Sequence, residues 1–423
     1  MTLPDPATRS TGRTVLLLAF LMLFFDGYDL FALGTVGPSL VTYEPWGGTA
    51  ATLGTVAAIT GAGMPIGAVL AGWLSDRTGR RLPVTIAMAL ISFSMLVAAI
   101  APTLALFSAA RFLTGISIGA LTPLIGALVS DHAPKTSRTL HIGTSFAALG
   151  IGGSVSAFLG ALLLPEVHFQ WLFLPGVLPL LLIWPLWRLL PAGVPQDQPE
   201  PGDERRAPHP RELFSAPLLR ATVLTWAATF LSLALVFSTS SWLPTVLLRN
   251  GYAMTSALQF TVAFTIGASL GVVGLGWLAD RGHLRVATVG GFAVAAAVLI
   301  LLPFAREQSP AVIYVLCGLA GVGSLAGQAL VVACVVDVYP ARLRGTALGF
   351  GQGFGRFGAI VGPVYLAVMT TVFATPYAGF FAFALIALLG GLAIILLPRR
   401  RVVESAPPRP NGTPAAEQGQ RTR

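Results

Sequence analysis

Long apolar stretches alternate with short polar segments along most of the chain. Each stretch has the roughly 20 residues that a helix needs to cross a bilayer, and none shows the in–out alternation of a membrane β-strand. The pattern therefore predicts an all-α membrane protein with twelve transmembrane helices. We place them at residues 14–40, 50–74, 82–101, 104–131, 140–164, 169–190, 220–248, 256–279, 285–304, 310–338, 344–372 and 376–397.

The two halves of the chain repeat each other. Gly-Trp-Leu-Ser-Asp-Arg at residues 72–77 recurs as Gly-Trp-Leu-Ala-Asp-Arg at residues 276–281, and Asp131 and Arg138 recur at the same mutual spacing as Asp337 and Arg344. Such recurrence indicates two parallel six-helix repeats with a substrate site between them near the midplane. We expect an N-terminal bundle (1–190), a polar, Pro-rich cytoplasmic linker (191–219), a C-terminal bundle (220–398) and a disordered cytoplasmic tail (399–423).

Charge placement sets the orientation. Only 10% of the residues are charged, against about 25% in a soluble protein, so the composition indicates a membrane protein. Most of the basic residues fall in segments on one side of the predicted spans, which is the positive-inside asymmetry and predicts that both termini are cytoplasmic. The net charge of +9 is therefore a feature of topology, and we expect no nucleic-acid partner. The first span is too long and too acidic for a cleaved signal segment, so we expect it to be retained.

Four charged residues fall inside the predicted spans. Asp26 and Asp29 lie in the first span, three positions apart and so on one helix face, and a carboxylate at this depth costs about 2.5–3.5 kcal/mol. From helix rise, Arg356 lies at the depth of Asp26, and Arg111 lies close to the depth of Asp29. Their repeat counterparts are uncharged, so the four are additions to the duplicated scaffold. Two acids and two arginines at matching depths are typical of a proton-coupled carrier of an organic anion.

Several motifs resemble those of a known family. The stretch Gly-Trp-Leu-Ser-Asp-Arg-Thr-Gly-Arg-Arg at residues 72–81 resembles the loop 2–3 signature of the major facilitator superfamily. Asp-Gly-Tyr-Asp at residues 26–29 and Arg-Phe-Leu-Thr-Gly at residues 111–115 resemble the aromatic acid:H+ symporters of that superfamily. Further matches are found at residues 242–245, 344–346 and 355–358. The resemblance implies the major facilitator fold and import of an aromatic carboxylate, such as a hydroxybenzoate, with protons.

The resemblance and the intramembrane charges together suggest a substrate site. We expect Arg356 to hold the substrate carboxylate, and Gln328 to bond a ring hydroxyl. Asp26 and Asp29 would carry the proton, one of them held ionised by Arg111. Aromatic side chains near these acids are candidates to stack on the substrate ring. They are Phe25, Tyr28 and Phe31; core or lipid-facing packing is an equally good interpretation of these three.

The cytoplasmic motifs are candidates for a gate. Asp76 can cap the N-terminus of the eleventh span near Gly345, where exposed backbone donors favour an anion. Arginines of the same loop would bridge to nearby acids such as Asp131, and the second half would do the same; simple loop anchoring is the alternative. The gating set is Gly72, Asp76, Arg77, Arg80, Asp131, Arg138, Asp280, Arg281, Asp337 and Arg344.

Two other classes of function compete with the symporter. A drug:proton antiporter, which exports, uses the same fold and also couples to buried acids, but the pairing of acids with Arg356 favours an anion that moves with a proton. A membrane enzyme or sensor would need a nucleophile–base pair, a metal cluster or a nucleotide loop, and the spans contain none. We therefore expect no enzyme activity, cofactor or metal. The partners would be a small organic acid, protons and the lipid of a bacterial inner membrane. Each chain holds a complete site, so it would act as a monomer.

Overall fold

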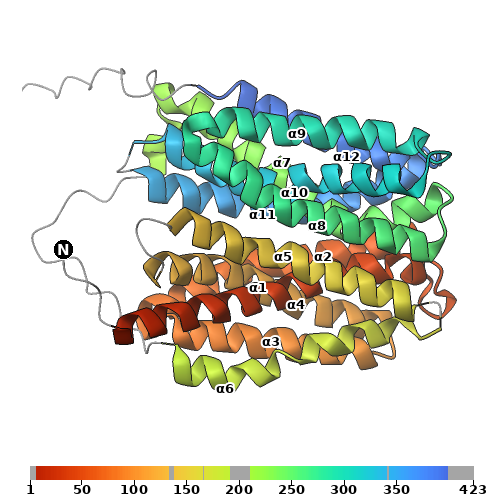
Figure 1. Ribbon diagram of the computed structural model, residues 1–423, viewed down its shortest axis with the longest axis horizontal. Helices are drawn as coiled ribbons and strands as arrows, with labels where there is room; N and C mark the ends of the chain where they lie inside the picture. Colours follow the sequence, from red (N-terminus) through yellow and green to blue (C-terminus); the bar gives the residue numbers. More distant parts are fainter. Residues whose placement is uncertain (1–5, 133–137, 165, 191–209, 341–342, 399–423) are drawn as a thin grey trace, which may run out of the picture.

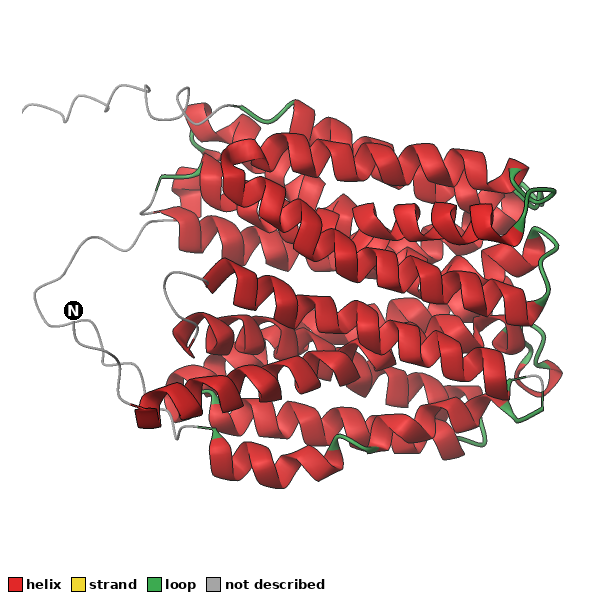
Figure 2. Cartoon of the chain, in the orientation of Figure 1, coloured by secondary structure: helices red, strands yellow, loops and turns green. Residues whose placement is uncertain are grey.

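The computed structural model describes residues 6–132, 138–164, 166–190, 210–340 and 343–398. These residues form a bundle of long α-helices, and no strand occurs among them (Figure 2). The α-helices are α1 (Pro6–Leu40), α2 (Ala50–Thr78), α3 (Arg81–Ile100), α4 (Leu104–His132), α5 (Arg138–Leu163), α6 (Leu180–Leu189), α7 (Ala216–Arg249), α8 (Met254–Leu278), α9 (Leu284–Leu301), α10 (Pro310–Val338), α11 (Arg344–Val372) and α12 (Ala378–Ile395).

Eleven segments of the described chain are long and apolar enough to cross a membrane. One of them, Met254–Phe304, has 51 residues and includes both α8 and α9. A short π-helical turn, Ala279–His283, divides the two, and Gly282 within it has φ 87°. A side chain is strained at such a φ, whereas glycine adopts it readily. Gly79, at the end of α2 in the first half, has φ 72°. The structure thus confirms an all-α protein with multiple apolar helices of spanning length.

The sixth predicted span differs from the expectation. We predicted one helix over residues 169–190, but the chain there forms a 3-10 helix, Phe169–Val177, followed by the shorter α6. Pro175 and Pro179 lie at this break. Proline has no backbone N–H, and its ring clashes with the preceding turn, so a continuous α-helix is interrupted. Most of the expected linker and all of the expected tail lie outside the described residues, except that α7 begins at Ala216, earlier than predicted.

Matching helix pairs pack in the two halves of the chain (Figure 1). In the first half α1 packs on α5, α2 on α4, and α3 on α4; in the second half α7 packs on α11, α8 on α10, and α9 on α10. The halves contact each other through α5 and α8, α2 and α11, and α1 and α7. We call the end of the bundle where α1 begins, at the left of Figure 1, the near end, and the opposite end the far end.

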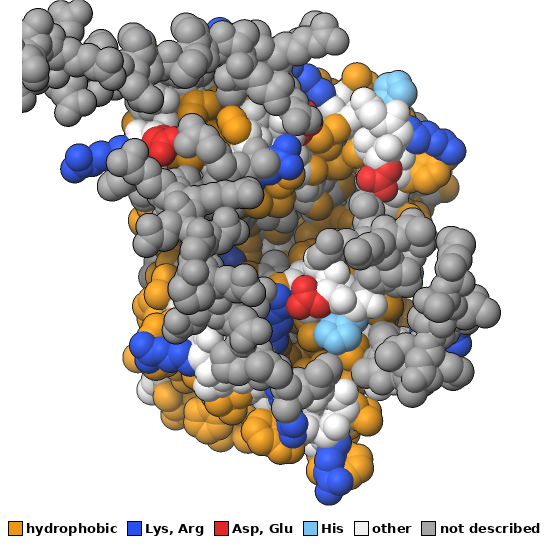
Figure 3. All heavy atoms as spheres, turned by 90° about the vertical axis from the view of Figure 1, so that its left-hand side faces the viewer, with side chains coloured by type: hydrophobic (Ala, Val, Ile, Leu, Met, Phe, Trp, Pro, Cys, Tyr) orange, Lys and Arg blue, Asp and Glu red, His pale blue; other side chains and the backbone are white. Residues whose placement is uncertain are grey.

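The halves touch closely toward the far end. The backbone of Gly34 on α1 contacts the carbonyl of Ser240 on α7, and a Cβ on Gly61 of α2 would lie 2.7 Å from the carbonyl oxygen of Ala359 on α11. Toward the near end, Gly72 of α2 and Gly345 of α11 face open space. Figure 3 looks onto the near end and shows a hollow between the two groups of helices. The bundle is therefore closed at its far end and open at its near end.

Large apolar side chains cover the outside of the bundle. Leu17, Val69, Leu181, Val286 and Val368 are among many that are exposed. Such a surface is unfavourable in water and suits contact with lipid chains, where the backbone of each helix satisfies its own hydrogen bonds. Exposed apolar surface and spanning length together make the chain a multi-pass membrane protein.

Candidate functional site

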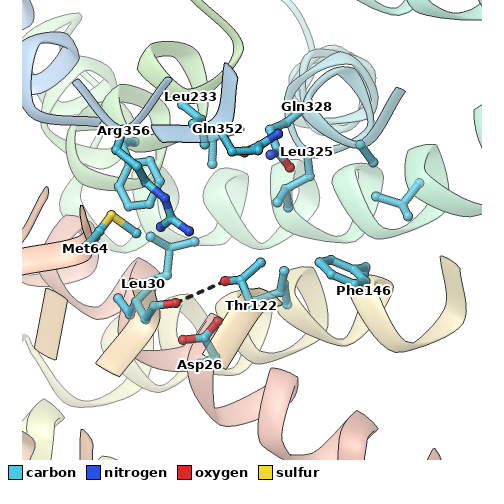
Figure 4. Close-up of a pocket in the computed structure, with 16 residues that line it drawn as sticks. Asp26, Leu30, Met64, Thr122, Phe146, Leu233, Leu325, Gln328, Gln352 and Arg356 are labelled. Carbon is cyan, nitrogen blue, oxygen red and sulfur yellow. Dashed lines mark hydrogen bonds between the residues drawn. The ribbon is translucent and has the colours of Figure 1, made fainter. Parts of the chain in front are cut away.

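A cavity lies between the two halves in the middle of the bundle (Figure 4). Helices α1, α2, α4 and α5 line it from one half, and α7, α8, α10 and α11 from the other. Most of the lining side chains are apolar, and two of them are the phenyl rings of Phe146 and Phe237. Only five of the residues that line this central cavity are polar or charged: Asp26, Thr122, Gln328, Gln352 and Arg356.

Asp26 and Arg356 face each other across the central cavity. Asp26 is 1% exposed and Arg356 is 9% exposed, and Figure 4 shows the guanidinium extending toward the carboxylate. Within the described residues neither forms an ion pair, and Asp26 Oδ1 has no hydrogen-bond partner. The structure places both residues in the lining of one cavity, which agrees with the depth match inferred from helix rise. A buried guanidinium without a protein anion is a strong site for a carboxylate, which it can hold with two parallel hydrogen bonds.

Asp29 has a different environment. Arg111 Nη1 donates to Asp29 Oδ1 over 2.6 Å, and both side chains are 1% exposed. The Arg111 guanidinium also lies 5.8 Å from the centre of the Phe173 ring. The expected proximity of Arg111 to one of the two acids is confirmed. Neither Asp29 nor Arg111 lines the central cavity. The two acids expected on one helix face therefore have different surroundings: Asp26 faces the cavity, and Asp29 forms a buried ion pair with Arg111.

The aromatic lining differs from the prediction, and we correct it. Tyr28 is buried, and its hydroxyl donates to the carbonyl of Leu172 over 2.7 Å. Phe31 packs on Gly153 of α5, and Phe25 packs edge-on against Phe24 at 5.3 Å. None of the three lines the central cavity. On α1 the cavity face carries Asp26 and, one turn later, Leu30.

The structure supplies aromatic side chains from other helices. Phe146 of α5 and Phe237 of α7 line the central cavity. No feature of the sequence distinguished these two rings from other apolar positions of their helices. Gln352 could have been found from its spacing, because it lies four residues before Arg356 and therefore on the same face of α11.

One contact of the predicted gating set is present in the first half. Arg80, at the start of α3, forms an ion pair with Asp131 of α4. Arg77 stacks on the ring of Trp73 at 4.1 Å. Asp76, Gly72, Arg80 and Asp131 together line a polar cavity at the near end of α2 and α4. The side chain of Arg138 lies outside the described residues.

Asp76 does not reach α11 in this conformation. The first turn of α11 has no side-chain cap, and open space surrounds Gly345. In the second half, Arg281 stacks on Trp277 at 3.3 Å, which repeats the Arg77–Trp73 arrangement. Arg344 Nε donates to the carbonyl of Tyr339 over 3.1 Å. Asp280 and Asp337 are exposed and line separate near-end pockets. Both ion pairs found among the described residues lie within the first half, so no salt bridge there joins the halves at the near end.

A helical bundle of this kind, with a central cavity that holds buried charges, defines a membrane transporter. The chain matches the model of the Major Facilitator Superfamily over residues 19–363 and 257–419, and it belongs to that superfamily.

Curated relatives agree with this assignment. The chain is 33% identical to the gentisate transporter of Corynebacterium glutamicum, over 92% of this chain and 88% of that protein. It is 29% identical to the benzoate transport protein of Acinetobacter baylyi, over 93% of this chain and 91% of that one. These names confirm the resemblance to aromatic acid transporters drawn from the motifs, and they confirm a transporter rather than an enzyme.

The fold has solved counterparts. A D-xylose–proton symporter superposes with a TM-score of 0.74, at 17% sequence identity, over 92% of this chain and 98% of that one. At this identity the similarity concerns the fold alone, and it supports the major facilitator architecture.

Proposed function

We propose that this chain is a proton-coupled secondary transporter that imports an aromatic carboxylate of the hydroxybenzoate type by alternating access. The observation that carries the proposal is the central cavity, in which an unpaired, nine-tenths buried Arg356 and a buried Asp26 accompany two phenyl rings. A guanidinium suits a carboxylate, phenyl rings suit an aromatic ring, and an acid without an ionic partner suits a proton. The names of the aromatic acid relatives support the same cargo.

Asp26 carries the coupling proton in this mechanism. It shares the cavity with Arg356, so arrival of a substrate carboxylate at Arg356 changes the charge balance around Asp26. Asp29 remains paired with Arg111 and orients α1 against α4. With Asp26 protonated and the substrate carboxylate on Arg356, the cavity has no net charge, as it has when proton and substrate are both absent. Either one alone leaves a net unit charge, which is costly inside the membrane, so proton and substrate move together.

The architecture in the membrane is part of the proposal. Twelve spans form two six-helix repeats, supported by the matching helix pairs and by the Arg–Trp stacking that occurs in both halves. The near end faces the cytoplasm of a bacterium, because most of the basic residues in the described part of the chain lie there, so both termini are cytoplasmic and the conformation is open inward. The near-end motifs gate the other conformation, in which Asp76 reaches α11. Each chain has its own cavity and works as a monomer.

The first test is uptake of labelled aromatic acids into proteoliposomes under an imposed inward-directed proton gradient. We expect accumulation of at least one acid that a protonophore abolishes. Failure of every acid to enter, together with proton-driven extrusion of a cationic dye, would overturn import and establish the drug:proton antiporter.

Arg356→Lys should raise the KM for the acid about 10- to 100-fold, because lysine keeps the charge but loses the two parallel hydrogen bonds. Arg356→Ala should abolish uptake. The matched control is Arg220→Lys, since Arg220 is exposed and donates only to the carbonyl of Leu396. An unchanged KM in Arg356→Lys would exclude Arg356 as the carboxylate anchor.

Asp26→Asn should separate coupling from transport. Asparagine has the size of aspartate but does not titrate, so gradient-driven accumulation should fall to the background while exchange of labelled for unlabelled acid across the membrane continues. Both are measured in the same proteoliposomes. Accumulation at the wild-type level in Asp26→Asn would show that another group carries the proton.

A further inference from the structure

Two amide side chains complete the polar lining of the central cavity. Gln352 comes from α11 and Gln328 from α10, and both are partly buried. Figure 4 shows them extending toward one another at the side of the cavity away from Asp26. Neither amide makes a hydrogen bond to another described residue. An amide offers two donors and one acceptor, so these two side chains can bond a polar group of a ligand in this mostly apolar cavity.

Their distance from the carboxylate anchor fits a small aromatic acid. Gln352 and Arg356 are four residues apart on one helix, a rise of about 6 Å at 1.5 Å per residue. That is close to the length of a benzene ring with one substituent at each end. Because both side chains leave the same face of α11, a carboxylate held by Arg356 leaves the aromatic ring in the cavity that the two amides, Phe146 and Phe237 also line.

The remaining polar lining residue offers less to a ligand. The Thr122 hydroxyl donates to the carbonyl of Ile118 over 3.1 Å, so its proton is already used. A phenolic hydroxyl both donates and accepts, and an amide pair can meet both needs at once. The two glutamines are therefore the groups of this cavity best suited to a ring hydroxyl.

We infer that Gln328 and Gln352 act together to select aromatic acids that carry a hydroxyl opposite the carboxylate over acids that lack it. The inference rests on the proposed function and deepens it by naming the substrate class. A site built to hydrogen-bond a hydroxyl discriminates against an analogue without one, because the amides that line the cavity then lose that hydrogen bond to the ligand. An apolar pocket of the same shape distinguishes the two acids weakly.

The test begins with the wild-type protein in proteoliposomes. Uptake of labelled 4-hydroxybenzoate is measured in competition with unlabelled 4-hydroxybenzoate, benzoate and 4-methylbenzoate, whose methyl group fills the space of the hydroxyl without bonding. We expect both analogues to compete at least tenfold more weakly than 4-hydroxybenzoate. Equal competition by 4-methylbenzoate would show that the site reads shape rather than the hydroxyl, and would overturn the inference.

The second part assigns the selectivity to the amides. In the Gln328→Leu/Gln352→Leu protein, the KM for 4-hydroxybenzoate should rise at least tenfold while the KM for benzoate changes less than threefold. Gln308→Leu is the matched control, because it makes the same change at an exposed glutamine outside the central cavity, and it should keep the wild-type preference. An equal loss for both acids, or an unchanged ratio of the two KM values, would overturn the role of the amides while leaving transport of aromatic acids intact. Failure of the wild-type protein to take up either acid would instead overturn the proposed function and this inference with it.

Discussion

Asp26 and Asp29 lie three residues apart on α1, yet they meet different partners. Asp26 faces the cavity and Arg356, whereas Asp29 is hydrogen-bonded to Arg111. Three residues turn a helix by about 300°, which leaves the two side chains 60° apart around its axis. That offset is enough to direct one carboxylate between the halves and the other into the first half. Sequence spacing correctly predicted two neighbouring acids in the membrane but did not separate their roles.

The buried pair should matter for stability in a way that Asp26 does not. Removing one partner of a buried ion pair leaves the other charge uncompensated and costs about 3–5 kcal/mol. We therefore expect Asp29→Ala and Arg111→Ala each to lower the melting temperature of the detergent-solubilised protein, and Asp29→Leu/Arg111→Met to recover most of the loss. Asp26→Ala is the control on the same helix and should not destabilise, since Asp26 forms no ion pair with the described residues. Additive losses in the double variant would contradict a specific pair.

At the scale of the helices, close contact between the halves depends on residues without side chains. Gly34 of α1 lies against the backbone of Ser240, and Gly150 of α5 lies against α8, where Ser269 Oγ donates to the carbonyl of Ala147 over 2.9 Å. Ser154 and Thr265 add a hydrogen bond of 2.8 Å between the same two helices. Small residues let helices approach in lipid, where packing and hydrogen bonds replace the hydrophobic drive.

Gly34→Leu should therefore shift the molecule away from the conformation described. A leucine at this position meets backbone that cannot move aside, and overpacking typically costs about 1–3 kcal/mol, a factor of roughly 5 to 150 in the population closed at the far end. The shift is measured as a slower reaction of a Thr122→Cys probe with a thiol reagent applied at the near end. Gly290→Leu is the control, because open space surrounds Gly290. An equal rate in both variants would show that the α1–α7 contact does not hold the far end closed.

At the scale of the whole molecule, the arrangement of charge and contact defines two different ends. The halves touch through three helix pairs, of which α1 and α7 meet toward the far end at Gly34 and Ser240, and no ion pair found in the described part of the chain joins them at the near end. A carrier with this asymmetry exposes its central site on one side at a time, which is the requirement of alternating access.

The orientation of the protein in the membrane is tested by labelling single cysteines from one side or the other. In a background where Cys317 and Cys334, both buried, are replaced by alanine, Thr122→Cys should react with a membrane-impermeant maleimide in inside-out vesicles and at least tenfold more slowly in right-side-out vesicles. Gln308→Cys, in the far-end loop between α9 and α10, should react in the opposite pattern. Labelling of both positions from the same side would contradict the proposed topology.

Much of this architecture follows from the sequence alone. A run of about 20 apolar residues must satisfy its own backbone hydrogen bonds in lipid, so helix existence and approximate length are local properties. The same holds for the repeated Trp–Arg motif, whose stacking joins residues four apart in the chain in both halves, Trp73 with Arg77 within α2 and Trp277 at the end of α8 with Arg281 in the turn that follows it. The sixth span has the predicted length and apolarity at Phe169–Leu189, but it is not one continuous α-helix, because Pro175 and Pro179 interrupt it.

The pairing of charges required the tertiary structure. Arg111 and Asp29 are 82 residues apart, and which acid Arg111 meets depends on how α4 is rotated against α1. The same rotation directs Tyr28 to Leu172 and away from the cavity, and it leaves the aromatic lining to Phe146 and Phe237. The sequence determined which residues could lie in the membrane and which of them carry charge, because those are properties of each segment. Only the packing of helices from both halves decided which of those side chains meet in one cavity, because no single segment contains that information.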